Sequence, residues 1–291
     1  ADEREDNLSG KRVGGGRMRR AKVLMWTIST LDTRVLMNII GCMLSERQSQ
    51  LLDFIIREYV KTAEPVGSAM VCEKSDFEVS PATIRNEMGE LERTGYLAQP
   101  HTSAGRVPTD KAYRWFVNKL MEEGQYEVDP RSKRTINDAI SNAGPDPREL
   151  SRNAAQAIQE LSDNLVIANI ESSPDFYKVG LSRLMAFPEF RELGRMIQLT
   201  SMFDQFDELF GSFEREFFGD HRADQNFNIM IGHENPSRNI QGETMIIVKH
   251  RLPGGNVGTL TIIGPTRMDY RKNIGLAQYT SKLLDKLSER N

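Results

Sequence analysis

Apolar residues first recur at helical spacing in residues 45–59. Those on the common side of the helix are Leu51, Leu52, Ile55, Ile56 and Tyr59. A helix with one continuous apolar side packs that side against a core. Ser45 and Gln48 have the spacing of a capping box, in which each side chain bonds to the other residue's amide. The pattern predicts a buried first helix, and residues 64–72 predict a short second one.

A third helix is expected over residues 79–94. Its apolar residues are spaced at i, i+4 and i+7: Ile84, Met88 and Leu91. Ser80 can cap this helix, and Pro81 suits its first turn because proline has no amide hydrogen to leave unpaired. The side chains away from the stripe are small, hydroxyl, amide or guanidinium groups: Ala82, Thr83, Arg85, Asn86 and Arg93. Such groups suit the major groove of DNA, where arginine pairs with guanine and asparagine with adenine.

Residues 96–99 and 107–108 predict two strands around a turn-rich tip. The tip consists of Pro100, His101, Thr102, Ser103, Ala104, Gly105 and Arg106. Three helices followed by a hairpin is the element order of a winged-helix domain, in which the third helix enters the major groove and the hairpin contacts the DNA backbone. Thr109 can cap a linker helix over residues 109–121, whose apolar face could pack on the wing or against a second subunit. We expect residues 43–121 to form a winged helix-turn-helix DNA-binding domain that includes this linker helix.

The formal net charge of −3 excludes a protein that coats nucleic acid by bulk positive charge. Binding then depends on where individual side chains lie. The candidate DNA contacts are Ser80, Ala82, Thr83, Arg85, Asn86, Arg93, His101, Thr102, Ser103, Arg106, Lys111 and Arg114. Each of these could alternatively be an ordinary solvated surface residue. If about four phosphates are neutralised, log K should fall with log salt at a slope of roughly −3 to −4.

Residues 122–148 are polar and contain several glycines and prolines, so we expect a linker there. Residues 149–291 are expected to form an α/β domain with an antiparallel sheet. Its expected elements are a helix over residues 149–162, a strand over 164–170, a helix over 176–187, apolar-faced helices within 191–218, a strand over 226–232, a hairpin of 243–252 and 257–263, and a final helix after residue 270. The chain as a whole is therefore assigned to the α+β class.

Residues 1–42 differ from the rest of the chain. A polar, glycine-rich start precedes an apolar run that Asp32 and Arg34 interrupt. This run weakly imitates a signal peptide, and it is too short and too charged to span a bilayer. We expect a poorly ordered extension, which either reflects an upstream start assignment or forms an extra arm toward DNA.

The sequence shows no arrangement typical of catalysis or metal binding. Its two cysteines, Cys42 and Cys72, and its four histidines have no metal-ligand spacing, and no nucleophile with a base or phosphate-binding loop is visible. We expect a cytoplasmic protein that is not an enzyme and has no metal, no cofactor and no membrane segment.

Three stretches resemble the bacterial HrcA family of heat-inducible transcription repressors. They are residues 45–68 (SERQSQLLDFIIREYVKTAEPVGS), 80–117 (SPATIRNEMGELERTGYLAQPHTSAGRVPTDKAYRWFV) and 264–270 (GPTRMDY). The run PHTSAGRVPTDKAYR is too long and too unusual in composition for chance to explain it. The resemblance implies a GAF-like regulatory and dimerisation domain over residues 149–291.

The resemblance also implies a function. A homodimer would bind CIRCE, an inverted-repeat operator in double-stranded DNA upstream of chaperonin operons, and would associate with the nucleoid when bound. A GroEL-type chaperonin would maintain its activity, heat would relieve repression, and no cofactor would be needed. Two departures stand out. HrcA sequences usually begin near the position of Met43, and they carry an insertion between the strand of residues 164–170 and the following helix. Here five residues join those elements, so a dimer must use another surface, such as the linker helix or the long helices of the second domain.

Two other functions remain open. The GAF-like domain could bind a small ligand that gates DNA binding, or the winged helix could contact protein instead of DNA. The GPTRMDY turn also has two interpretations. Arg267 could help the next helix to hold an anion, or it could be tied to Asp269 or to a backbone carbonyl, and we favour the structural role.

Overall fold

A computed structural model describes residues 44–75, 77–171, 173, 175–218 and 226–289, with residues 207–218 described by backbone alone. The chain divides into two compact units, residues 1–49 and 50–291. The expectations for residues 1–42 lie outside the described residues. In the first unit, Ser45 and Gln48 form the expected capping box: the Ser45 amide donates to Gln48 Oε1 at 3.1 Å, and the Gln48 amide donates to Ser45 Oγ at 3.2 Å. This box begins α3 (Glu46–Thr62).

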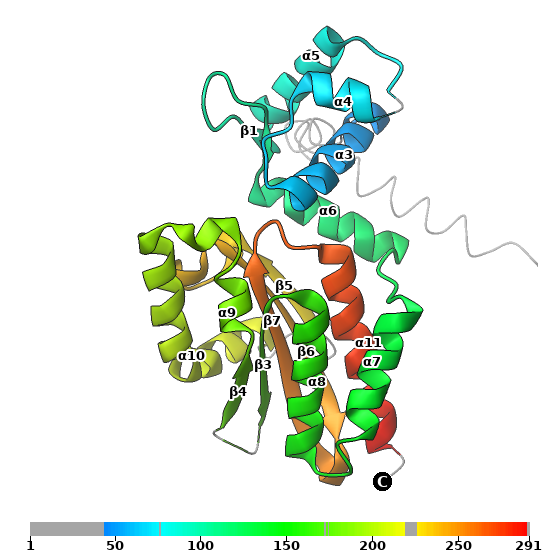
Figure 1. Cartoon of the computed structure of the whole chain (residues 1–291), viewed down its shortest axis with the longest axis vertical. Coiled ribbons are helices and arrows are strands. Elements are labelled where there is room, and N and C mark those ends of the chain that lie inside the picture. Colours follow the sequence, from blue (N-terminus) through cyan, green and yellow to red (C-terminus); the bar gives the residue numbers. More distant parts are fainter. Residues whose placement is uncertain (1–43, 76, 172, 174, 219–225, 290–291) are drawn as a thin grey trace, which may run out of the picture. The chain divides into compact units, whose positions relative to one another are not determined.

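The second unit begins with three helices and a hairpin (Figure 1). After α3 come α4 (Ser68–Lys74), α5 (Pro81–Arg93), β1 (Leu97–Ala98) and β2 (Val107–Pro108). The apolar stripe expected on each of the two longer helices is buried except for Tyr59, which is half-buried. The buried members are Leu51, Leu52, Ile55, Ile56, Ile84, Met88 and Leu91. The element order expected from the sequence is therefore present, and we refer to residues 50–108 as the helix–hairpin segment.

Helix α6 (Asp110–Glu123) follows the hairpin directly, and Thr109 Oγ1 caps it by accepting from the Ala112 amide at 3.4 Å. Its apolar face is buried: Ala112, Tyr113, Phe116, Val117 and Leu120. The same chain covers this face, because Arg57 of α3 lies 5.8 Å from the centre of the Phe116 ring, and the Tyr113 and Tyr270 rings are 5.7 Å apart. In this structure the apolar face of α6 thus packs on α3 and Tyr270, whereas one of our two expectations placed it on the wing.

Residues 122–148, expected to be a linker, contain a helix that the sequence analysis missed. Helix α7 (Pro130–Ser141) begins at Asp129, whose carboxylate accepts from the Arg131 and Ser132 amides at 3.0 Å. The buried residues of this helix are Ser132, Ile136 and Ile140, of which only the two isoleucines have large apolar side chains. Two apolar positions in twelve residues make too weak a periodic signal to predict a helix.

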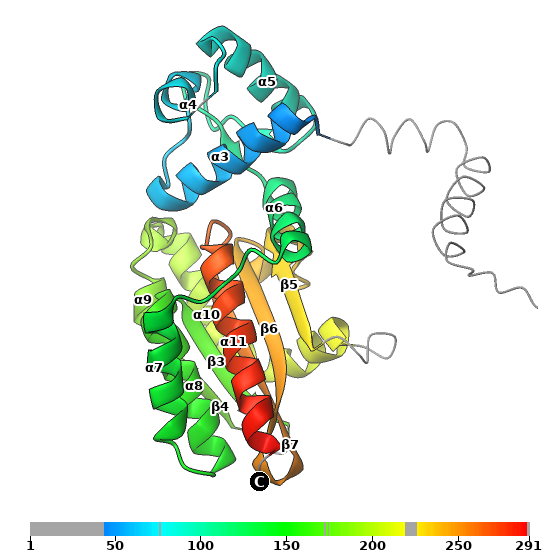
Figure 2. The same cartoon turned by 90° about the vertical axis from the view of Figure 1, so that its right-hand side faces the viewer.

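The rest of the chain is built on a five-stranded antiparallel sheet. Its strand order is β4 (Phe176–Val179), β3 (Leu165–Ile170), β7 (Asn256–Pro265), β6 (Glu243–Leu252) and β5 (Phe227–Ile231). Helices α8 (Pro147–Ser162) and α11 (Tyr270–Ser288) pack on the sheet (Figures 1 and 2). Helix α7 packs on these two helices. The expected antiparallel sheet and the α+β class are confirmed.

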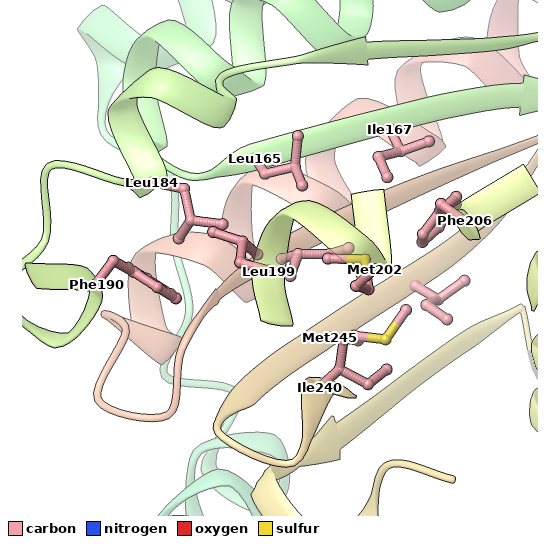
Figure 3. Close-up of a cluster of buried hydrophobic side chains, with 11 residues drawn as sticks. Leu165, Ile167, Leu184, Phe190, Leu199, Met202, Phe206, Ile240 and Met245 are labelled. Carbon is pink, nitrogen blue, oxygen red and sulfur yellow. The ribbon is translucent and has the colours of Figure 1, made fainter. Parts of the chain in front are cut away.

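The opposite face of the sheet carries a buried apolar cluster. We call residues 130–289, as far as they are described, the sheet region. Its further elements are helix α10 (Leu193–Phe218), α9 (Leu181–Leu184) and the 3-10 turns η1 (Pro188–Arg191), η2 (Gly232–Glu234), η3 (Arg238–Ile240) and η4 (Pro253–Gly255). Met245 of β6 lies in the cluster with Leu199 and Met202 of α10 (Figure 3). Its neighbour Thr244 bonds to Tyr270 of α11 at 2.8 Å. Successive residues of β6 therefore point to opposite faces of the sheet, one toward α10 and the next toward α11.

The helix expected over residues 176–187 is wrong in its first part. Residues 176–179 form β4, and Val179 pairs with Val166 of β3. Residues 171–175 leave only a short connection after β3, so the returning chain reaches the free edge of that strand and pairs with it. Such a short apolar stretch does not distinguish a helix from a strand by its spacing. The hairpin of β6 and β7 and the final helix α11 agree with the expectation.

One buried group makes the fold sensitive to pH. His250 of β6 is 2% exposed, and neither ring nitrogen has a hydrogen-bond partner among the described residues. Gly258, opposite on β7, leaves room for the ring, since a Cβ there would lie 2.6 Å from His250 Nε2. Burial lowers the pKa of His250 from 6.5 to about 4. The imidazole is therefore neutral in the folded protein, whereas in the unfolded chain it takes up a proton below pH 6.5.

We predict that acid weakens this fold through His250. The group's contribution to stability is complete above its unfolded pKa of 6.5 and is lost as the pH falls toward its folded value of about 4. Between about pH 7.5 and about pH 5, the wild type should lose about 2 kcal/mol of unfolding free energy through this group. This loss is measured by urea unfolding of the wild type and of His250→Leu at both pH values. An equal pH dependence in the two proteins would contradict the prediction.

Candidate nucleic-acid interface

Helix α5 is held at both ends by local bonds. Ser80 Oγ accepts from the Thr83 amide at 3.2 Å, and Pro81 occupies the first turn. At the other end Gly95 adopts a φ of +80°, which few other residues tolerate, and the Tyr96 amide bonds back to Leu91 O at 2.8 Å. Its inner stripe is buried, so the opposite side faces outward. The exposed candidates on and before α5 are Ser80, Ala82, Arg85, Asn86 and Arg93, while Thr83 is half-buried.

Two of these side chains are free to bind a partner. Within the described part of the chain, Arg85 and Asn86 make no ion pair and no side-chain hydrogen bond. Arg93 pairs with Glu90 on the same helix at 2.8 Å, and both side chains are exposed. An exposed pair of this kind contributes little stability, so a phosphate could replace the carboxylate.

The hairpin of β1 and β2 is fastened to the start of α4. Val66 and Arg106 form a bridge in which each amide donates to the other carbonyl, at 2.9 and 2.8 Å. Gly105 makes this approach possible, because a Cβ there would lie 2.5 Å from the Val66 carbonyl. At the tip, Gln99 Nε2 donates to Thr102 O and Ala104 O, both at 3.0 Å. These bonds give the tip a defined shape and leave His101, Thr102 and Ser103 exposed.

An open hollow of about 580 Å³ lies between α4, α5 and the tip. Four of the candidate residues line it: Arg85, Thr102, Ser103 and Arg106. Arg106 is tied to Glu92 of α5 at 2.9 Å, which links the hairpin to that helix. The structure thus brings residues of the helix and the hairpin together around one concave surface. The candidates there supply two guanidinium groups, of which Arg106 is paired with Glu92, and two hydroxyl groups.

The remaining candidates, Lys111 and Arg114, are engaged by their own chain. Lys111 Nζ donates to Thr94 O at 2.8 Å and lies 4.3 Å from the centre of the Tyr96 ring. Arg114 donates to Glu234 Oε1 at 2.8 Å and to Ile229 O at 2.7 Å. The structure supplies no unpaired guanidinium for a phosphate at Arg114.

Sequence reasoning missed the residues that shape this surface. Ser68 and Met88 line the hollow, and Gln99, Gly105 and Glu92 hold the hairpin in place. Among these residues only Gly105 could be suspected from the sequence, because it is a glycine in the turn-rich tip. The partners of Gly105 and Arg106 lie far away in the sequence, so no local pattern could reveal them.

The GPTRMDY turn has the structural role that we favoured: Arg267 bonds to a backbone carbonyl, as expected, and its carboxylate partner is Glu189 and not Asp269. Arg267 is 8% exposed and pairs with Glu189, its Nη2 lying 3.1 Å from Glu189 Oε2. Its Nη1 donates to Val60 O of α3 at 3.2 Å. Asp269 instead caps α11 by accepting from the Lys272 amide at 3.1 Å.

In the described ranges, no three or more His, Cys, Asp and Glu side chains gather where they could hold a metal ion. Among the described helices, none has the length and apolar character needed to cross a bilayer.

Comparison with known proteins gives one family. The model of the HrcA protein C-terminal domain matches residues 119–274. A relative from Desulforudis audaxviator is 27% identical over 346 residues, covering 85% of this chain and 98% of the relative. One from Geobacter sulfurreducens is 27% identical over 344 residues (84% and 98%), and one from Symbiobacterium thermophilum is 37% identical over 158 residues (54% and 45%). All three are named heat-inducible transcription repressor HrcA.

A crystal structure of a hypothetical protein has the same fold. It matches with a TM-score of 0.71 and 18% identity, covering 85% of this chain and 99% of the other. The alignment to the Desulforudis relative is longer than the 291 residues of this chain, so that relative has residues without a counterpart here. The family model spans more than half of the sequence, and the chain therefore belongs to the HrcA family of heat-inducible transcription repressors.

Proposed function

We propose that this protein represses heat-shock chaperone operons by binding an inverted-repeat operator of the CIRCE type, and that heat relieves the repression. HrcA proteins are transcription repressors and not enzymes. The helix–hairpin segment is the DNA-binding part, a winged helix-turn-helix with α5 as the recognition helix. The observation that carries this proposal is the outward face of α5, where Arg85 and Asn86 are exposed and without a partner among the described residues.

The chemistry of this face suits direct reading of bases. A guanidinium can bond to guanine O6 and N7 together, and a carboxamide can bond to adenine N6 and N7. Ala82 on the same side is small enough to let the helix come close to a thymine methyl group. The exposed hydroxyls of Thr102 and Ser103, together with His101, lie on the hairpin tip. Hydroxyl and imidazole groups of this kind bond to phosphates and fix the register of the helix on the duplex.

The other parts of the proposal rest on family membership. The sheet region is a GAF-like regulatory domain, and two copies form a homodimer that matches the symmetry of an inverted repeat. A GroEL-type chaperonin maintains the active fold in the cytoplasm, and the protein associates with the nucleoid when bound to its operator. Heat response then needs only marginal stability. When the inactive form dominates, a change of ~1.4 kcal/mol in the free-energy difference between the active and inactive forms changes the amount of active protein tenfold.

The operator claim is tested by binding to three duplexes. One carries the CIRCE inverted repeat, one a single half-site and one a scrambled sequence, and the mass of the protein is measured in solution alongside. Preference for the full repeat by a dimer is the expected result. Equal, weak and salt-sensitive binding to all three duplexes would refute the proposal.

We predict that Arg85→Ala and Asn86→Ala each reduce discrimination between operator and scrambled DNA by about 5- to 150-fold, because a bidentate base contact provides about 1–3 kcal/mol of discrimination. Competition binding at fixed salt measures the loss. Arg152→Ala is the matched control, since Arg152 is an exposed arginine of α8, outside the proposed interface, that pairs with Glu149 at 3.5 Å and lies 5.1 Å from the centre of the Tyr177 ring. Arg85→Ala that abolishes repression in cells but leaves DNA affinity unchanged would favour a protein partner for this face.

We also predict that Gly105→Ala damages the hairpin. A methyl group 2.5 Å from the Val66 carbonyl must push the hairpin away from α4, at a cost of about 1–3 kcal/mol in unfolding free energy. Operator affinity should fall with it. Gly89→Ala is the matched control, because Gly89 is inside α5 with open space around its Cβ position. Alanine there should stabilise the helix by about 0.5–1 kcal/mol. If urea unfolding shows that both variants change the unfolding free energy in the same direction, this interpretation is wrong.

A further inference from the structure

Helix α6 is joined to the turn η2 by contacts from two successive turns of the helix. The Asp110 carboxylate accepts from the His233 amide at 2.9 Å, and it lies 2.7 Å from His233 Nδ1. One turn later, Arg114 donates to Glu234 and to Ile229 O at the end of β5. Helix α6 thus supplies the acid Asp110 and the base Arg114, and η2 supplies their respective partners, His233 and Glu234. We call this set of contacts the α6–η2 joint.

The α6–η2 joint depends on close packing as well as on charge. Gly232 adopts a φ of +54°, and a Cβ there would lie 2.1 Å from Asp110 Oδ2. A side chain at residue 232 would therefore displace the Asp110 carboxylate. Glu234 is oriented by its own chain, because its Oε2 accepts from the Ile231 amide at 2.9 Å. An exposed ion pair alone contributes little, but a pair reinforced by backbone bonds and a close-fitting glycine holds a defined geometry.

Helix α6 is coupled directly to the proposed DNA-binding surface. Thr109, its cap, donates through Oγ1 to Gly95 O at 2.8 Å and to Tyr96 O at 3.1 Å. Lys111 bonds to Thr94 O. These three carbonyls lie immediately after α5, and Thr109 itself follows β2. A rotation of α6 must therefore move the end of the recognition helix and the base of the hairpin with it.

We propose that Asp110 and Arg114 are positioning residues for operator recognition: through the α6–η2 joint they hold the helix–hairpin segment at one orientation, and so determine the separation of the two half-sites that a dimer can read. This inference rests on the proposed function. It assigns Arg114 to the joint instead of to a phosphate. In an inverted repeat, each copy reads one half-site, so an error in the orientation of α6 changes the spacing at which both copies fit.

The experiment separates half-site affinity from spacing. Wild type, Arg114→Ala, Glu234→Gln and the double variant are titrated against a single half-site and against inverted repeats with base pairs added or removed between the half-sites. We expect half-site affinity to stay within about twofold, and preference for the natural spacing to fall about tenfold in each single variant. The double variant should lose no more than either single one, because both remove the same contact.

Two further proteins sharpen the result. The charge-reversed pair, Arg114→Glu with Glu234→Arg, should recover part of the spacing preference. Arg183→Ala is the matched control, since Arg183 forms an exposed ion pair with Asp163 at 2.9 Å elsewhere on the sheet region, and it should behave as the wild type. If Arg114→Ala instead weakens the half-site and reduces the salt slope by about one phosphate while Glu234→Gln does nothing, Arg114 is a DNA contact and the proposal is wrong. Tighter binding by the joint variants would also overturn it.

A measurement without DNA keeps the two proposals distinguishable. Amide hydrogen exchange of residues 229–234 should be faster in Asp110→Ala and Glu234→Ala than in the wild type, because the His233 and Ile231 amides lose their acceptors. Exchange in β6 and β7 should not change. Unchanged exchange in residues 229–234 would refute the joint whatever the DNA result. If the wild type binds no duplex, the proposed function fails, and the exchange result decides the joint by itself.

Discussion

The structure depends on the burial of the apolar face of α6. Tyr113 and Phe116 pack against α3 and Tyr270, so one helix contributes to the core of the helix–hairpin segment and also contacts the sheet region. Burial raises the pKa of the Tyr113 hydroxyl well above its ordinary value. Because the buried face fixes the rotation of α6, its polar residues are fixed too. Asp110 and Arg114 lie where they meet η2, and Thr109 and Lys111 lie where they meet the end of α5.

Pairing of charges bears on how an acidic chain can present the DNA-binding surface that we propose. The net charge is −3, yet two acidic residues near the proposed interface pair with arginines of their own chain: Glu92 with Arg106, and, in the absence of DNA, Glu90 with Arg93. These pairs neutralise carboxylates that would otherwise repel phosphates. Arg85 is left exposed without a carboxylate partner among the described residues. Affinity for DNA then depends on the positions of a few groups, which favours sequence-specific contacts over general attraction to phosphate.

The sheet region combines a tightly packed apolar layer with buried polar groups. Leu199, Met202 and Phe206 of α10 pack on the sheet beside Met245 (Figure 3). On the other face, His250 is buried with no partner for its ring among the described residues. Such a group lowers stability relative to a satisfied core. A domain that carries it is closer to the threshold of unfolding, which agrees with our proposal that the active fold is lost on heating.

Local patterns in the sequence determined α3, α5, α6, α11 and the hairpin of β6 and β7, because apolar spacing and caps such as Ser80 and Thr109 act within a few residues. They also identified the exposed side chains of α5 and the hairpin tip that we propose as DNA contacts. Arg114 was a candidate on the same grounds. Its position on α6 followed from the sequence, but its partner Glu234 is 120 residues away.

Only the tertiary structure decided such long-range pairings. It placed Gly105 against Val66 and Gly258 against His250, gave Arg267 the partner Glu189, and made β4 an edge strand. The physical reason is that these contacts depend on which segments the packed core brings together. The spacing of residues along the chain carries no record of that arrangement.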